Sequence, residues 1–138
     1  MLRHHLRALA LGIACACALT AHAAEPEKFK LTPVLLDRMQ VLQTEADAMG
    51  KGQAERDVDA QSVAELAREL DADPRIRALL AKHRISSGDY ATAVFAALHA
   101  GTFLAMEPTL GKRDRSAALA KFTPEQRANI ELLRKRTP

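Results

Sequence analysis

The sequence predicts an all-α protein, a compact bundle of four to five helices with a buried central helix. Apolar residues recur at intervals of three and four, the period of an α-helix, and no segment alternates with the period of two that a strand shows. Thr-Pro or Asp-Pro pairs begin at residues 32, 73 and 123. An N-cap side chain followed by proline is typical of a helix start, so three starts are predicted.

The first 23 residues have the pattern of a secretory signal peptide. Two arginines precede an uncharged apolar run over residues 8–19, and the Ala-His-Ala segment ending at Ala23 has small residues where a signal peptidase reads. The run is shorter than the ~20 residues that span a bilayer. We therefore expect cleavage after Ala23, a single helical domain over residues 24–138, and a periplasmic or secreted protein with no stable membrane span in the mature chain.

Both cysteines, Cys15 and Cys17, lie in this leader. Neither has the aliphatic residue three places upstream that a lipoprotein signal requires, which favours the ordinary peptidase, but the choice between the two peptidases stays open. The mature chain has no cysteine and hence no disulfide, thiol nucleophile or cysteine metal site.

The first helix is expected from Pro33 to Met49, after a loose polar start over residues 24–31. Gly50 ends it, because glycine takes a left-handed conformation without steric cost. Its apolar stripe consists of Leu35, Met39, Leu42, Ala46 and Met49.

Two shorter helices follow. Ser62 and Glu65 form a capping-box pattern, so the second helix begins at Ser62 or somewhat earlier, and Pro74 opens the third. Their inward positions are Val63, Leu66 and Leu70 in the second helix and Ile76, Leu79, Leu80 and His83 in the third.

Residues 90–106 are predicted to form the buried central helix. Ser86 and Asp89 cap its start, and the 17 residues from 90 to 106 carry no charge, as in a helix buried nearly all round. We expect Phe95 and Leu98 in the core. A close approach of a neighbouring helix is expected along a small-residue face made of Ala93, Ala97 and Gly101.

The remainder contains a turn over residues 107–111, one or two helical turns over residues 116–121, and a last helix beginning at Thr123. Ile130 and Leu133 of this helix are expected to face inward.

No pattern for an enzyme is found. The mature chain has four serines, all beside helix starts or in loops where capping explains them, and there is no nucleophile elbow, phosphate loop or metalloprotease motif. We expect a protein that is not an enzyme and has no cofactor.

His99 is the most unusual polar residue, since it lies within the uncharged helix. We interpret it as a core histidine bonded to a backbone carbonyl or to Thr102; it is a weak metal candidate because no second ligand lies three or four residues away. His83 is expected to complement a helix dipole. Methionines on apolar stripes are assigned to the core rather than to a copper site: Met39, Met49 and Met106.

Charge is distributed unevenly along the mature chain. Residues 24–73 contain six basic and twelve acidic residues, whereas residues 74–138 contain twelve basic and five acidic residues. The two halves can dock within one chain, pair in a homodimer, or recruit a charged protein partner. A homodimer would need apolar surface from Phe29, Phe103 or Phe122. The nearly balanced total argues against a nucleic-acid partner.

Two resemblances can be named. The segment Asp73-Pro74-Arg75-Ile76-Arg77-Ala78-Leu79-Leu80, followed by Ile85-Ser86-Ser87-Gly88-Asp89-Tyr90 and an alanine-rich helix, resembles small exported all-helical proteins of Gram-negative bacteria with no assigned function. Phe122-Thr123-Pro124-Glu125-Gln126 is similar to the Leu-Thr-x-x-Gln motif of periplasmic helical chaperones, with phenylalanine for leucine and without a second copy.

These observations favour a non-enzymatic binding or interaction protein. The alternatives are a small-ligand or metal-responsive protein that uses His99, and a chaperone of the periplasmic type implied by the second resemblance.

Overall fold

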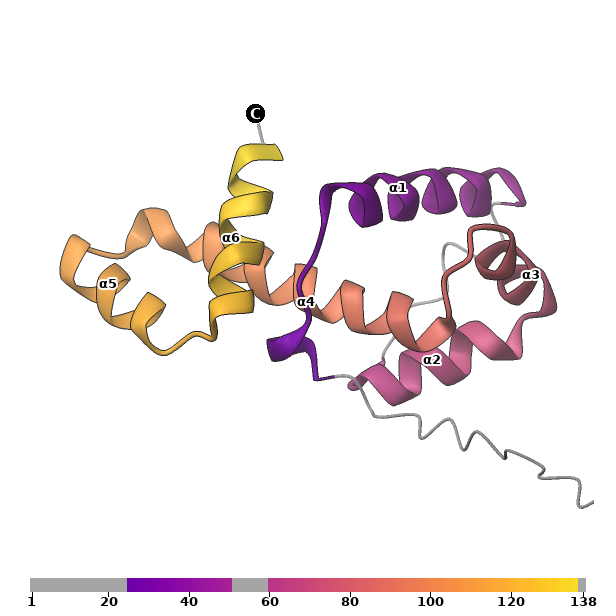
Figure 1. Ribbon diagram of the computed structural model, residues 1–138, viewed down its shortest axis with the longest axis horizontal. Helices are drawn as coiled ribbons and strands as arrows, with labels where there is room; N and C mark the ends of the chain where they lie inside the picture. The colour runs from indigo at the N-terminus through magenta and orange to yellow at the C-terminus, as the bar shows by residue number, and fades with distance from the viewer. Residues whose placement is uncertain (1–24, 51–59, 137–138) are drawn as a thin grey trace, which may run out of the picture.

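The computed structural model describes residues 25–50 and 60–136, and every regular element in these ranges is helical (Figure 1). The all-α class is therefore confirmed, although the described residues form six α-helices instead of four or five. The predicted leader, residues 1–23, lies outside the described residues. The elements are η1 (Pro26–Lys28), α1 (Pro33–Ala48), α2 (Val63–Ala72), α3 (Pro74–Lys82), α4 (Ser87–Met106), η2 (Glu107–Thr109), α5 (Lys112–Ala120) and α6 (Pro124–Arg136).

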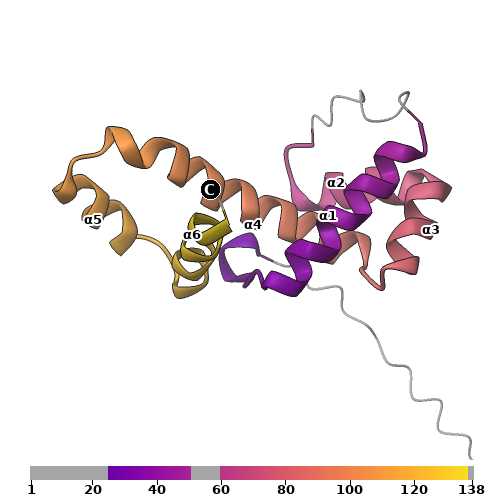
Figure 2. The same cartoon turned by 90° about the horizontal axis from the view of Figure 1, so that it is seen from above.

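Helix α4 is the axis of an elongated arrangement. Helices α1, α2 and α3 surround its N-terminal half, while α6 crosses it near the middle and α5 lies beyond α6, toward its C-terminal end (Figures 1 and 2). Both α2 and α6 pack directly on α4. No helix in the described ranges is long and apolar enough to cross a bilayer.

Local side-chain chemistry sets the helix starts. Thr32 Oγ1 accepts a hydrogen bond from the Leu35 amide at 3.1 Å, and Asp73 Oδ1 accepts one from the Arg75 amide at 2.9 Å. The predicted caps are thus confirmed, including Ser62, Ser86 and Thr123. Gly50 follows α1 with φ +140°, as a glycine terminator requires.

Helix α5 is longer than expected, because it begins at Lys112 rather than at residue 116. Gly111 precedes it, and Asp114 lies in its first turn. A carboxylate there is stabilised by the free amides of the helix N-terminus, so the charged segment continues the helix.

The α1–α3 end contains a well-filled aliphatic core. Leu42 from α1 meets Leu79 and Leu80 from α3 and Ile85 from the turn after it, and each is at most 7% exposed. Side chains of this size fill the space between helices without leaving a hollow.

A segment before α1 crosses to α6. Leu31 is buried, its amide donates to Asn129 Oδ1 at 2.8 Å, and Asn129 Nδ2 donates to the Phe29 carbonyl at 2.8 Å. Thr123 Oγ1 donates to the Glu27 carbonyl. We call residues 25–32 the strap. The expectation of a loose start over residues 24–31 is therefore wrong for the described residues 25–31, because α6 satisfies the backbone of this segment.

Helix α4 is buried nearly all round only in its N-terminal part, where residues 90–97, Phe95 among them, are all buried or half-buried. The expectation is wrong for the C-terminal part, because Leu98 is 58% exposed and His99, Thr102 and Met106 are exposed as well. The close-approach face differs at its third position, because nothing lies near the position of a Gly101 Cβ. The fully buried residues of the helix are Ala91, Thr92, Ala93, Ala96, Ala100 and Phe103.

Candidate ligand pocket

A pocket of about 480 Å³ lies between α4, α5 and α6, the three helices at the left-hand end of Figure 1. Eight of its eleven lining residues are apolar, and none carries a formal charge at neutral pH with histidine neutral. The lining comprises Ala96, His99, Ala100, Thr102, Phe103, Met106, Leu110, Ala118, Phe122, Gln126 and Ile130.

The inner wall of the pocket is buried. Phe103 and Ile130 are 6% and 2% exposed, and the Phe103 ring meets Phe122 edge to face, with 5.4 Å between ring centroids and an 86° interplanar angle. Phe103 therefore cannot supply surface for a dimer contact, whereas Phe29 and Phe122 are half-buried and pack partly on internal clusters.

Small side chains make the space. Ala96 and Ala100 stand one turn apart on α4, and Ala118 faces them from α5. An alanine fills far less room than the leucines at the other end of the molecule. Alanines on both α4 and α5 therefore leave room for the hollow.

His99, Thr102 and Gln126 are the polar groups of the pocket. The expectation that His99 is a buried core residue is wrong, because its side chain is exposed and forms no hydrogen bond with the described residues. His99 lies one turn from Ala96 and Phe103 on α4 and lines the pocket with them. His99 therefore offers its ring nitrogens to solvent or to a bound molecule.

Gln126 belongs to a capping box. Its Oε1 accepts from the Thr123 amide at 2.9 Å, and its own amide donates to Thr123 Oγ1 at 3.1 Å. The residues that resemble the chaperone motif thus form the start of α6. None of the described residues accepts a hydrogen bond from Gln126 Nε2.

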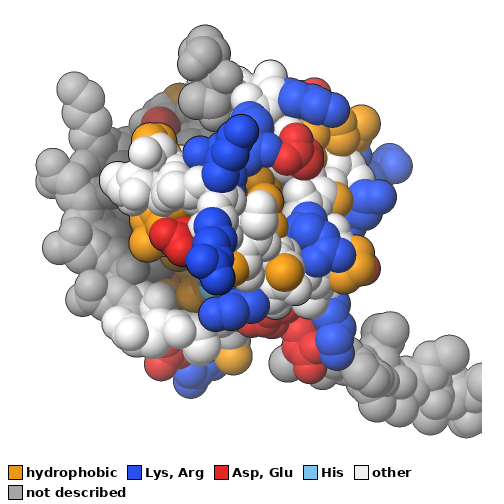
Figure 3. Space-filling view, turned by 90° about the vertical axis from the view of Figure 1, so that its left-hand side faces the viewer, with side chains coloured by type: hydrophobic (Ala, Val, Ile, Leu, Met, Phe, Trp, Pro, Cys, Tyr) orange, Lys and Arg blue, Asp and Glu red, His pale blue; other side chains and the backbone are white. Residues whose placement is uncertain are grey.

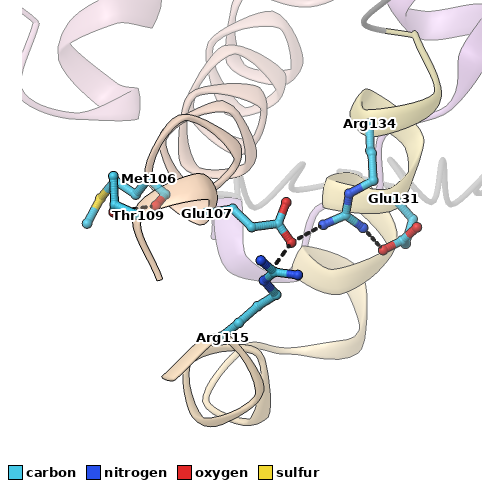
Figure 4. A network of polar contacts seen from close by, with 6 residues as sticks. All are labelled: Met106, Glu107, Thr109, Arg115, Glu131 and Arg134. Carbon is cyan, nitrogen blue, oxygen red and sulfur yellow. Dashed lines mark hydrogen bonds and ion pairs between the residues drawn. The ribbon is translucent and has the colours of Figure 1, made fainter. Parts of the chain in front are cut away.

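A network of ion pairs joins the elements that enclose the pocket. Glu107 Oε1 lies 2.7 Å from Arg134 Nη2 and 3.5 Å from Arg115 Nε, and Arg134 also pairs with Glu131 (Figure 4). The hydrogen bond to Glu107 raises the pKa of Arg134, so its charge is secure. Met106 points away from Glu107 at the end of α4 (Figure 4). The network therefore ties η2, α5 and α6 together while Met106 lines the pocket.

His83 lies at the opposite end of the molecule. Its Nε2 is 3.2 Å from Glu45 Oε1, and Lys82 Nζ is 2.6 Å from Glu45 Oε2. His83 is the C-cap of α3, as expected for a residue near a helix C-terminus, and it also links α3 to α1.

Metal-ligating side chains are dispersed. Within residues 25–50 and 60–136 no group of three His, Cys, Asp or Glu side chains comes together. Of the methionines considered as copper ligands, Met39 is partly buried, but Met49 and Met106 are 41% and 54% exposed, so their assignment to the core is wrong.

Sequence reasoning found only part of this pocket. Phe103 and Phe122 were considered for a dimer contact, Gln126 was considered only as part of the chaperone-like motif, and Leu110 and Ala118 were not singled out. The one sequence feature that could have indicated the pocket is the recurrence of alanine on two helices. It does not decide the matter, because alanines occur both where helices pack closely and where a cavity remains.

No protein-family model, no curated protein and no solved structure matches this chain.

Proposed function

We propose that this chain is a non-enzymatic binding protein whose ligand is a small, mostly hydrocarbon molecule held between α4, α5 and α6. One observation carries the proposal, namely the pocket of about 480 Å³ with its predominantly apolar lining. Small-molecule sites are typically 300–1,000 Å³ and mainly apolar, with a few polar groups. An ionised group inside would lose its hydration without meeting a counter-charge, so the enclosed part of the ligand is uncharged.

The polar groups suggest how such a ligand is oriented. His99 and Thr102 are exposed on α4, and Gln126 stands on α6. Each can exchange a hydrogen bond with a hydroxyl, carbonyl or amide of the ligand. The ligand that fits best has a hydrocarbon body against Phe103 and one polar group beside His99.

Binding can be tested with Nile red, a neutral dye whose fluorescence rises in apolar surroundings. Ala118→Phe places a ring in the pocket and should weaken dye binding at least about tenfold, which corresponds to about 1.4 kcal/mol. Ala117→Phe is the matched control, because Ala117 is the neighbouring exposed residue on α5 and does not line the pocket.

Circular dichroism and thermal melting must show that both variants are folded. Equal dye affinity in the two variants would exclude this pocket as the binding site.

An exported location remains part of the proposal and is supported by the leader pattern. Expression in a Gram-negative host should yield a periplasmic protein that begins at Ala24, as N-terminal sequencing would show. A mature start at Cys15 or Cys17 would instead indicate a lipoprotein.

A chaperone function is the second candidate. It is favoured by apolar side chains on the outer side of α4, where Leu98 is 58% and Met106 is 54% exposed. Protection of an unfolding client at an equimolar ratio, lost in Leu98→Asp, would support it. No protection at several-fold excess would remove it.

The metal-responsive alternative depends on His99 alone. Thermal shifts with a panel of divalent metals test it, because a ligand that binds only the folded state raises the melting temperature. A shift that disappears in His99→Gln would support this alternative.

A further inference from the structure

The side of α5 that faces away from the pocket presents an exposed surface. We call it the α5 outer face. Arg115, Ala118 and Leu119 on the opposite side of the helix are half-buried. The outer face is made of exposed residues spaced along one half of the helix and its C-cap: Lys112, Arg113, Ser116, Ala117, Ala120 and Lys121.

The three cations of this face are unpaired. The side chains of Lys112, Arg113 and Lys121 form no ion pair or hydrogen bond with the described residues. Asp114 is the one acidic residue of α5 and is exposed, so the exposed charged side chains of this helix and its C-cap carry a net charge of +2. Four other cations of residues 107–136 have partners: Arg115 and Arg134 pair with Glu107, Arg127 donates to the Phe122 carbonyl, and Arg136 pairs with Asp37.

The surroundings are also basic. Residues 107–136 carry eight basic and four acidic side chains, a net charge of +4. Figure 3 looks onto this end and shows Lys and Arg side chains spread over much of the face, with hydrophobic side chains between them. A surface of this kind attracts a partner with many negative charges.

We propose that the α5 outer face docks on an anionic lipid surface. Between its cations stand only Ser116, Ala117 and Ala120, which allow close approach but supply no aromatic or amide groups for stacking on or reading bases. A lipid surface needs only the charge and the close approach that this face supplies, so the choice of a lipid over a nucleic acid rests on the absence of base-contacting side chains from it.

Co-sedimentation with vesicles tests the proposal on the full mature chain. Binding to phosphatidylglycerol vesicles should exceed binding to phosphatidylcholine vesicles. Because each cation near such a surface contributes on the order of fivefold in affinity, Lys112→Gln, Arg113→Gln and Lys121→Gln together should weaken binding at least about tenfold. Binding should also fall between 0.1 M and 1 M salt, where the Debye length shortens from about 10 Å to about 3 Å.

The matched control removes three exposed cations outside residues 107–136, with Lys30→Gln, Arg38→Gln and Arg77→Gln. It changes the net charge equally and should retain most of the binding. The proposal is overturned if both triple variants lose binding equally, if the two vesicle types bind equally, or if duplex DNA binds more tightly than phosphatidylglycerol with the same dependence on the α5 cations.

Nile red separates this proposal from the proposed function. The α5 triple variant should bind the dye as the unmodified protein does, because its three residues do not line the pocket. Vesicle binding without dye binding would retain the docking surface and reject the pocket, and the reverse result would reject the docking surface alone.

Discussion

The two ends of α4 are built from the same kind of element with different side chains. At the α1–α3 end, leucines from α1 and α3 fill the space, and Lys82 and His83 pair with Glu45 across the helices. At the α5–α6 end, alanines of α4 and α5 line a pocket, and three cations of α5 have no partner among the described residues. Under the proposed function, the first end provides stability and the second provides binding.

The largest effect is expected at the filled end. Leu80 is 2% exposed, and Leu80→Ala should lower the free energy of unfolding by ~2–5 kcal/mol, because it removes buried methyl groups and leaves a cavity. Urea denaturation measures the change. Leu98→Ala is the control; Leu98 was expected in the core but is exposed, so its loss should cost less than ~1 kcal/mol. Equal losses in the two variants would break the comparison.

The strap should show the next largest effect. Asn129→Ala leaves the Leu31 amide and the Phe29 carbonyl without their partner, at a cost of ~1–3 kcal/mol for an unsatisfied buried group. Hydrogen exchange of the Leu31 amide should also accelerate. Gln40→Ala, at an exposed position of α1, is the control and should change neither measurement. Unchanged exchange in Asn129→Ala would show that the two hydrogen bonds of Asn129 do not hold the strap in place.

The ion pairs of the filled end make its stability depend on pH. A hydrogen bond from Lys82 and the nearby charges of Lys82 and His83 lower the pKa of Glu45 from its usual 4.5, against a smaller opposing effect of burial. The folded state therefore gains stability above pH 4.5, and the gain is lost as the pH falls through the lowered pKa. Chemical denaturation between pH 6 and pH 3 should show a shallower decline in Glu45→Gln. Identical declines would mean that Glu45 pairs equally in the unfolded chain.

The smallest effect on stability is expected at the pocket. His99→Gln changes an exposed side chain without a partner among the described residues, so the melting temperature should barely move, by the equivalent of ~0.5 kcal/mol or less. The thermal shift caused by a polar pocket ligand should decrease. A strongly destabilised His99→Gln would restore the interpretation of His99 as a core residue.

Local chemistry made much of the fold predictable. Thr32, Ser62, Asp73, Ser86 and Thr123 begin helices as predicted, because capping depends on residues within one turn. The extent of α5 was missed because a charged segment gives no apolar stripe.

The buried side of α4 could not be predicted. A helix without charge over 17 residues marks no side for burial, so Leu98 and His99 were placed in the core with the alanines. Burial is decided by α2, α6 and the strap, which pack on α4 from other parts of the sequence. The pocket could not be predicted either, because its lining on α4 depends on which side of that helix the other elements cover.

The hydrogen bonds between Asn129 and the strap also constrain the order in which the protein can fold. These two hydrogen bonds join residues 98 and 100 positions apart, so a ribosome must make α6 before the backbone of the strap is satisfied. Helices α1, α2 and α3 can meet earlier, and Leu31 of the strap can reach Ala93 and Ala96 before α6 exists, whereas long-range contacts form slowly because a long loop must close. During synthesis, the part of α4 around Ala100 and Phe103, which Ile130 of α6 covers, would therefore be among the last apolar surfaces to leave water.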